Sequence, residues 1–426
     1  MHLIKSGVNL KITVASALDN NYTMPTVVMI CSLLENASEE TAYEIFLLVP
    51  NNYEEENKNN FYSLIRNFPK HHISFINMGY EFENEHVPIA HITYPTYYRL
   101  LLSRLLCDCD KCIYLDGDML IQGDLRELYT EDVDDYYVAG VKSPSYCMTS
   151  KIREGNIRRL SLPSMKQYIN AGVLLMNLKK MREASMEDNF MDMLEQNRGQ
   201  TNDQDIINVQ CFGFIKTLPF RFNYQLEASA MGKAVLQQVF NDYEMIKNNE
   251  NPLIIHYSSS SVKPWKSIEY RFSDLWWEYF RKTSYGEKES WYKQKIEMDR
   301  KEKYTEFIRK KDVLYQQNNI VLFGYSDVSL ELYNKLTADG FIVTGFCDND
   351  KQKQGVKECG LEVYSLENCF HKFDDIFFIN TSQNHAEEIN QQLISAGVRE
   401  DKIMGYVRKG YWLDFLRKED MPDIYL

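Results

Sequence analysis

Short apolar runs alternate with longer amphipathic stretches along the early part of the chain. The apolar runs at 11–15, 44–49 and 72–76 predict strands, and the stretches 26–34 and 54–68 between them predict helices. Strands that alternate with helices in this way are typical of an α/β domain with a parallel sheet. The pattern therefore predicts an α/β fold for this part of the chain.

Further apolar runs extend the domain, and one of them leads directly into two acids. The run at 112–115 is followed at once by Asp116, Gly117 and Asp118. In open α/β sheets, ligands bind beyond the carboxyl ends of the strands, so we expect these carboxylates to face a ligand. The remaining expected strands are 136–141, 171–176 and 254–257, and the remaining expected helices are 97–106 and 182–198.

The same alternation restarts near residue 319 and predicts a second, smaller domain. Its expected strands are 319–323, 340–346 and 375–379, with a helix at 330–336. The expected organisation has three parts. They are an α/β domain over 1–270, a helical connector rich in basic and aromatic residues over 271–315, and a small, doubly wound, Rossmann-like α/β domain over 316–426.

Composition narrows the class of protein. The 426 residues include 48 basic and 61 acidic side chains, a formal net charge of −13, which argues against a nucleic-acid partner. The 9 cysteines are an odd number spread through a long chain, as expected for reduced thiols. The N-terminus lacks the apolar core of a signal peptide, and no apolar stretch reaches the roughly 18 residues of a membrane span. We therefore expect a cytoplasmic protein.

The segment 276–311 differs in charge from the rest of this acidic chain. Within it, residues 281–311 carry 11 basic and 6 acidic side chains, and Trp276, Trp277 and Trp291 lie in or beside them. One interpretation is an exposed connecting helix. The other is a surface that contacts the inner face of the membrane or an acidic partner.

The pair Asp116 and Asp118 predicts a metal site. Two carboxylates one residue apart can bind one divalent cation, and oxygen ligands suit Mg²⁺ or Mn²⁺. Such an ion can neutralise a diphosphate and so make a nucleotide a better leaving group. His256, at the end of a late strand, is a candidate third ligand. A solvated turn and a structural histidine are the alternatives for these residues.

Several motifs, taken in order, resemble those of the family 8 glycosyltransferases over about residues 10–265. These motifs are Ala17-Leu18-Asp19-Asn20-Asn21-Tyr22, Tyr98-Arg99-Leu100, the segment 111–120, the segment 168–178, Asn202-Asp203-Gln204-Asp205, and His256 with Lys263-Pro264-Trp265. The resemblance implies a GT-A fold, a Rossmann-like mixed sheet with helices on both faces. It also implies transfer of a sugar, with retention at the anomeric carbon, from a UDP-sugar to a glycan.

The resemblance also implies roles for individual residues. Asp116, Asp118 and His256 would hold Mn²⁺ on the diphosphate. The residues that would bind the donor are Ala17, Asp19, Asn21, Tyr22, Arg99, Asp116, Gly117, Asp118, Asn170, Ala171 and Lys263. Asp203, Gln204 and Asp205 would lie nearest the reacting carbon, and we favour a front-side route in which Gln204 stabilises positive charge and the leaving diphosphate helps to deprotonate the acceptor.

Two segments, 256–263 and 145–165, leave alternatives open for the function. The segment 256–263 lacks the glycine that the family has before Lys-Pro-Trp, and it is one residue longer. A non-catalytic scaffold of a glycan-assembly complex is therefore the runner-up, with 316–426 as the docking part or as the site of homo-oligomer contact. A further alternative is another enzyme on the same fold, namely a glycan phosphorylase, a nucleotidyltransferase or a nucleotide-sugar hydrolase. The basic segment 145–165 is either a mobile loop or a contact for an anionic acceptor.

The second predicted domain does not carry the full dinucleotide fingerprint. Gly324 holds the first glycine place of Gly-x-Gly-x-x-Gly, but Ser326 and Ser329 hold the other two. Loss of the second glycine hinders close approach to a pyrophosphate, so no NAD is expected. Asp348 stands where an acid that binds ribose would be, which leaves a small-ligand site as the alternative to a role in assembly.

Overall fold

The computed structural model divides the chain into two compact units, Met1–Lys293 and Gln294–Leu426, which we describe separately. The structure describes residues 10–85, 93–146, 150–196, 201–226, 251–258, 263–266, 271–298, 316–338, 340–382 and 386–405. The finer division into 1–270, 271–315 and 316–426 stays a prediction.

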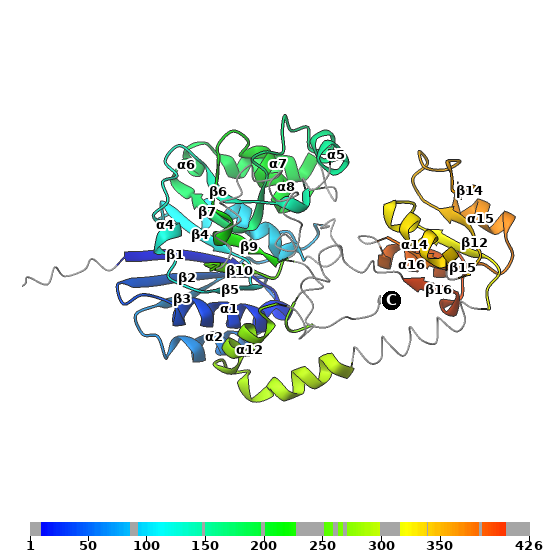
Figure 1. The fold of residues 1–426 in the computed structure, drawn as a ribbon. Coiled ribbons are helices and arrows are strands. Elements are labelled where there is room, and N and C mark those ends of the chain that lie inside the picture. Colours follow the sequence, from blue (N-terminus) through cyan, green and yellow to red (C-terminus); the bar gives the residue numbers. More distant parts are fainter. Residues whose placement is uncertain are drawn as a thin grey trace, which may run out of the picture. The chain divides into compact units, whose positions relative to one another are not determined.

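The first unit is built on a sheet of seven strands in the order β3-β2-β1-β4-β7-β6-β8 (Figure 1). The strands are β1 (Leu10–Ala17), β2 (Thr41–Val49), β3 (His72–Asn77), β4 (Lys111–Leu115), β6 (Val138–Lys142), β7 (Ile169–Asn177) and β8 (Ile215–Thr217). Strands β1 to β4 pair in parallel, as the alternation predicted. Strand β7 runs antiparallel to both β4 and β6, so the sheet as a whole is mixed.

A small second sheet brings a distant part of the chain to the end of β4. Its strands are β5 (Met119–Ile121), β9 (Tyr224–Gln225) and β10 (Ile254–His256). Strand β5 follows β4 after a three-residue turn, and β10 pairs with β5 in antiparallel register, with His256 opposite Met119. This register places His256 beside the turn that carries Asp116 and Asp118.

Helices cover both faces of the large sheet. One face packs against η2 (Tyr94–Leu101), α3 (Leu102–Leu105), α6 (Leu178–Glu183), α7 (Met186–Gln196) and α8 (Asp203–Gln210), in a core that includes Ala15, Leu48, Tyr114, Leu174 and Ile207. Helix α1 (Thr23–Glu35) contacts β5, α2 (Glu55–Ile65) and α12 (Ser273–Arg281). Other helices described in this unit are η1 (Asn20–Tyr22), α4 (Arg126–Tyr129), η3 (Pro144–Tyr146), α5 (Ser150–Leu160), η4 (Phe220–Asn223) and η6 (Gly286–Lys288).

Two predicted helices differ in detail from the expectation. The stretch 97–106 is mainly the 3₁₀ helix η2, followed by the single turn α3. The stretch 182–198 is divided between α6 and α7, because Ser185 has a left-handed backbone with φ of 48° that ends the first helix. The basic segment 145–165, one interpretation of which was a loop, contains helix α5.

The predicted connector is only partly within the described residues. Helix α12 buries Trp276, Trp277 and Phe280 almost completely, so these rings belong to the core of the first unit. Residues 289–298 are helical, and Trp291 among them is 57% exposed. Residues 299–311 of the predicted basic segment lie outside the described residues. No helix within the described part of the chain combines the length and the apolar character that a membrane crossing requires.

The second unit holds a sheet of six strands in the order β13-β14-β12-β11-β15-β16. The strands are β11 (Ile320–Phe323), β12 (Val343–Cys347), β13 (Lys357–Glu358), β14 (Leu361–Tyr364), β15 (Phe377–Asn380) and β16 (Ile403–Gly405). The helices are α14 (Asp327–Ala338), α15 (Leu366–Lys372), α16 (Ala386–Ser395) and η7 (Glu400–Lys402). Apart from β13 the strands pair in parallel, which confirms a second α/β sheet.

Candidate active site

The turn between β4 and β5 carries the two acids of the predicted metal site. Asp116 is partly exposed, and Asp118 is buried. Gly117 lies between them against helix α1, where a Cβ would come within 2.2 Å of Thr26 Oγ1 and 3.4 Å of the Tyr22 ring. Because α1 approaches so closely, only glycine fits at the centre of this turn.

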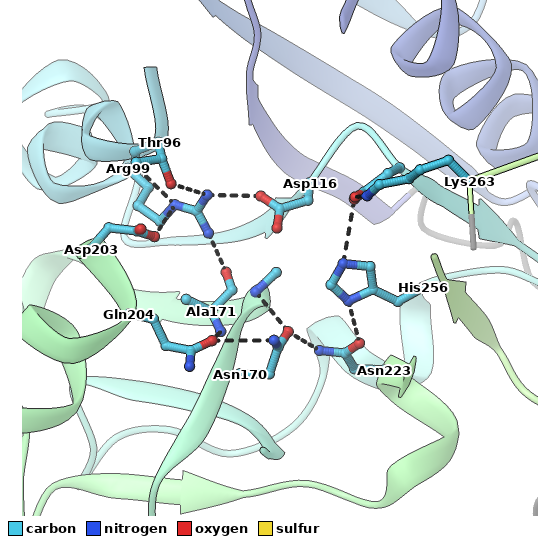
Figure 2. Close-up of polar contacts among 12 residues, drawn as sticks. Thr96, Arg99, Asp116, Asn170, Ala171, Asp203, Gln204, Asn223, His256 and Lys263 are labelled. Atoms are coloured by element: carbon cyan, nitrogen blue, oxygen red, sulfur yellow. Dashed lines mark hydrogen bonds and ion pairs between the residues drawn. The ribbon is translucent and has the colours of Figure 1, made fainter. Parts of the chain in front are cut away.

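His256 completes a group of three candidate metal ligands. Asp116, Asp118 and His256 each offer one ligand atom, and these atoms lie within 4.8 Å of one another. Nε2 of His256 is 3.4 Å from Oδ1 of Asp118 (Figure 2). The three residues that the sequence predicted as ligands are therefore brought together, although 138 positions (256 − 118) separate the histidine from the nearer acid.

Two further observations show that this group suits a divalent cation. Oδ1 of Asp118 is buried and receives no hydrogen bond within the described structure. At Gly172 on β7, an added Cβ would lie 2.4 Å from Cε1 of His256 and 2.9 Å from Oδ2 of Asp116. The glycine therefore leaves space between the ligands, and an unpaired carboxylate oxygen points to a missing cation. Two carboxylates and an imidazole are a donor set that Mn²⁺ and Mg²⁺ accept.

Lys263 lies beside the same carboxylate. Its ammonium forms an ion pair with Oδ2 of Asp118 and donates to the carbonyl oxygen of Tyr257 at 2.6 Å. Burial would raise the pKa of Asp118, but the charge of the Lys263 ammonium outweighs it and holds that pKa well below its usual range. The same pairing holds the pKa of Lys263 above its usual value, although burial alone would lower it. Both groups are therefore charged.

Arg99 on η2 binds the carboxylate of Asp116. It is 4% exposed and donates to Oδ1 of Asp116 at 2.8 Å and to the carbonyl oxygen of Ala171 at 2.6 Å. It also bonds to Thr96 and lies 3.0 Å from Oδ2 of Asp203. The guanidinium thus joins η2, β7, α8 and the acidic turn, which fixes the direction of the Asp116 carboxylate. Contact of Arg99 with a donor stays a prediction.

The acids at the start of α8 are both engaged in ion pairs. Asp203 is paired with Arg99, and its burial raises its pKa, partly offset by the Arg99 charge. Asp205 accepts two hydrogen bonds from Arg159 on α5, at 2.8 and 3.1 Å, and one from the hydroxyl of Tyr168 at 2.6 Å. Gln204 is partly exposed, and its Oε1 accepts from the Ala171 N–H at 3.0 Å.

The first turn after β1 lies beside the turn that carries Asp116 and Asp118, since Tyr22 lies next to Gly117. Asp19 caps η1 by accepting from the N–H groups of Asn21 and Tyr22, and its second oxygen accepts from Thr93 at 2.9 Å. The ring of Tyr22 meets Trp265 edge-on at 6.2 Å. Burial, reinforced by the charge of Asp118, raises the pKa of Tyr22 to about 12. Asn21 is exposed, and Ala17 at the end of β1 is partly exposed.

Sequence reasoning missed three side chains that build this site. The Thr96 hydroxyl accepts from Arg99, the Tyr168 hydroxyl bridges Gln204 and Asp205, and Asn223 bonds to both Asn170 and His256. Tyr168 begins one of the recognised motifs, so a signal for it existed. Asn223 stands among aromatic residues with no motif around it, and only the fold brings it to His256.

The family of the chain follows from a direct match. The sequence model of glycosyl transferase family 8 matches residues 13–269, which is more than half of the chain. The chain belongs to glycosyltransferase family 8. This confirms the resemblance that the ordered motifs carry, and Asp116, Asp118 and His256 all lie within the matched segment. A separate model, of the C2185-like N-terminal domain, matches residues 316–404 of the second unit.

Bacterial relatives of this family 8 chain include proteins that are named as glycosyltransferases. The glycosyltransferase GlyE of Streptococcus pneumoniae is 27% identical over 194 residues, which are 45% of this chain and 42% of GlyE. The lipopolysaccharide 1,2-glucosyltransferase of Escherichia coli K12 is 30% identical over 175 residues, which are 40% of this chain and 48% of that enzyme. The chain thus spans less than half the length of these relatives.

Solved glycosyltransferase structures share the fold of the family 8 chain. The bifunctional glycosyltransferase WbbM superposes with a TM-score of 0.56 at 22% identity, covering 68% of this chain and 52% of WbbM. The galactosyltransferase LgtC, solved with donor and acceptor sugar analogs, gives a TM-score of 0.53 at 24% identity, covering 64% of this chain and 96% of LgtC. These likenesses confirm the expected GT-A fold.

Proposed function

We propose that this protein is a retaining glycosyltransferase that moves a hexose, glucose or galactose, from a UDP-sugar to a glycan acceptor on a lipid or protein. The observation that carries the proposal is the convergence of Asp116, Asp118 and His256 at the end of β4. Membership of family 8 supports it, as do the glucosyltransferase and galactosyltransferase names of the relatives.

The proposed donor binds through its diphosphate. Asp116, Asp118 and His256 would hold Mn²⁺ or Mg²⁺, and the bound ion would neutralise the diphosphate so that UDP departs more readily. The Lys263 ammonium is already charged and lies next to Asp118. We propose that it donates to a phosphate oxygen as negative charge develops on the leaving group.

The proposed transfer proceeds on the front face of the sugar. The bond between the anomeric carbon and the diphosphate oxygen breaks, a bond to the acceptor hydroxyl oxygen forms, and the hydroxyl proton passes to the departing diphosphate. Gln204 is the proposed group that stabilises positive charge on the sugar. The buried ion pairs of Asp203 with Arg99 and of Asp205 with Arg159 favour supporting roles for these two acids.

The scaffold alternative is less well supported than the enzyme. A scaffold would not need the three ligands to converge, and the structure brings them together. Residues 259–262, within the segment that lacks the family's glycine, lie outside the described part of the chain. A cytoplasmic location, membrane contact through 276–311 and assembly through 316–426 stay predictions.

Release of UDP from a panel of UDP-sugars, with and without Mn²⁺, tests the proposal. We expect release from one hexose donor that depends on the metal. Asp118→Asn should lower it by about 100-fold or more, because metal assistance contributes several kcal/mol to the transition state. Asp110→Asn is the matched control, since that side chain is 82% exposed and should leave turnover unchanged. Absence of turnover with every donor and metal would favour the scaffold.

A further inference from the structure

A chain of hydrogen-bonded side-chain amides lies next to His256, on the side of the ring away from Asp118. Asn223, at the end of η4, is 0% exposed and lies between His256 on β10 and Asn170 on β7 (Figure 2). Nδ1 of His256 is 2.9 Å from Oδ1 of Asn223. Nδ2 of Asn223 is 2.8 Å from Oδ1 of Asn170.

Backbone groups fix which way each amide faces. The Gly172 N–H, 3.0 Å from Asn170, can only donate, so the Asn170 atom that it meets is the oxygen. At the other end, the Ala171 N–H donates to Gln204 Oε1, and Nδ2 of Asn170 donates to that same oxygen at 3.2 Å. The contact with Gly172 and the contact with Gln204 give the Asn170 amide the same orientation. The first depends on the Gly172 N–H and the second on the Ala171 N–H.

The orientation of Asn170 determines that of Asn223. Because the oxygen of Asn170 only accepts, Asn223 must present its NH₂ group there, and its own oxygen therefore faces His256. An amide oxygen cannot donate, so the proton of a neutral His256 ring belongs on Nδ1. Nε2 then carries the lone pair, and it faces Oδ1 of Asp118 at 3.4 Å.

We propose that Asn223 is a positioning residue that holds His256 in the Nδ1–H tautomer, with the Nε2 lone pair directed at the metal position. The neutral imidazole binds metals through such a lone pair, and a hydrogen bond at the other nitrogen fixes the ring. The role in metal binding rests on the proposed function. The assignment of the tautomer rests only on the hydrogen bonds among Gly172, Asn170, Asn223 and His256.

The tautomer is measured directly on the metal-free, full-length protein labelled with ¹⁵N-histidine. Long-range ¹H–¹⁵N spectra are recorded at about pH 8, above the ordinary histidine pKa of about 6.5. The spectrum of His256→Gln assigns the resonances of His256. We expect the Nδ1–H pattern in the wild-type protein, and an Nε2–H pattern there would overturn the proposal.

Two variants of similar size separate a positioning role from simple packing. Asn223→Leu removes the acceptor, so His256 should show a mixture of tautomers, and the affinity for Mn²⁺ should fall by about 10- to 100-fold. Asn170→Asp keeps an oxygen facing both Gly172 and Asn223, so the tautomer should stay. If Asn223→Leu unfolds, Asn223→Ser replaces it, because its hydroxyl is too short to reach His256.

The two readouts distinguish failure of this inference from failure of the proposed function. Mn²⁺ affinity is followed through the electron paramagnetic resonance of the free ion, without any sugar donor. An unchanged tautomer and an Mn²⁺ affinity within about twofold of wild type in a folded Asn223→Leu protein would refute the role of Asn223. An Nδ1–H tautomer that Asn223→Leu abolishes, in a protein that binds no Mn²⁺, would instead refute the metal site.

Discussion

At the scale of single residues, the candidate site depends on a position that has no side chain. A Cβ at Gly172 would lie within 2.4 Å of His256 and 2.9 Å of Asp116. Gly172→Ala should therefore push the ligands apart and lower the affinity for Mn²⁺ by about tenfold or more, as loss of ligand placement does elsewhere. Titration of Mn²⁺ in the presence of UDP measures this.

Gly155→Ala is the control for that substitution. Gly155 lies within helix α5, and a Cβ there meets no atom within 4 Å. Alanine should leave Mn²⁺ affinity unchanged and stabilise the helix by about 0.5–1 kcal/mol. Equal affinities for Mn²⁺ in Gly172→Ala and wild type would show that the metal does not bind between Asp116 and His256.

At the scale of secondary-structure elements, the sequence predicted which segments form strands better than it predicted their direction. The apolar runs predicted β1 to β4 and placed the two acids at the end of β4, because the spacing of apolar residues is a local property of the sequence. The reversal of β7 is not local. It follows from pairing with β4, where the Asp116 N–H donates to the carbonyl oxygen of Gly172 at 2.9 Å.

The site residues also divide into those that a local sequence motif predicts and those that only the fold brings together. Asp116, Asp118 and His256 lie in recognised motifs, so the sequence could predict them as ligands. Asn223 could not be found in this way, because its partners lie on β7 and β10 and its neighbours in the sequence are aromatic. Arg99 was expected at the donor. Its position beside Asp116 depends on the packing of η2 against α8 and on its hydrogen bond to the carbonyl oxygen of Ala171 on β7.

His71, the residue before β3, should make the stability of the first unit depend on pH. His71 is 5% exposed, and its Nδ1 accepts from the Tyr43 N–H on β2 at 3.0 Å. Burial, with the charge of Lys70, lowers its pKa from 6.5 to about 4. The folded pKa is depressed, so His71 stabilises above pH 6.5, and this contribution falls by up to about 1.4 kcal/mol per pH unit as the pH drops from 6.5 toward 4.

Urea unfolding between these pH values tests the histidine. The free energy of unfolding of wild type should fall more steeply with decreasing pH than that of His71→Gln, which carries no titrating ring. His72→Gln is the matched control, because His72 is exposed and should keep the wild-type slope. Parallel slopes for all three proteins would mean that His71 titrates alike in the folded and unfolded states.

At the scale of the whole molecule, the candidate site and the six-stranded sheet belong to different compact units. All the site residues lie within Met1–Lys293, and Gln294–Leu426 has hydrophobic clusters of its own around β11, β12 and β15. A chain shortened after residue 298 should therefore keep Mn²⁺-dependent UDP release within about twofold of the full chain, since the site residues and the partners described for them all lie in the first unit. Loss of release from a folded short chain would place 316–426 in the reaction.

The central claim is that Asp116, Asp118 and His256 hold a divalent cation on the diphosphate of a nucleotide. A crystal grown with Mn²⁺ and UDP, measured at the manganese absorption edge, tests it most directly. The account predicts an anomalous peak about 2.0–2.3 Å from both carboxylates and from Nε2 of His256, with phosphate oxygens on its open side. Bound UDP with no anomalous peak among these three side chains would contradict it.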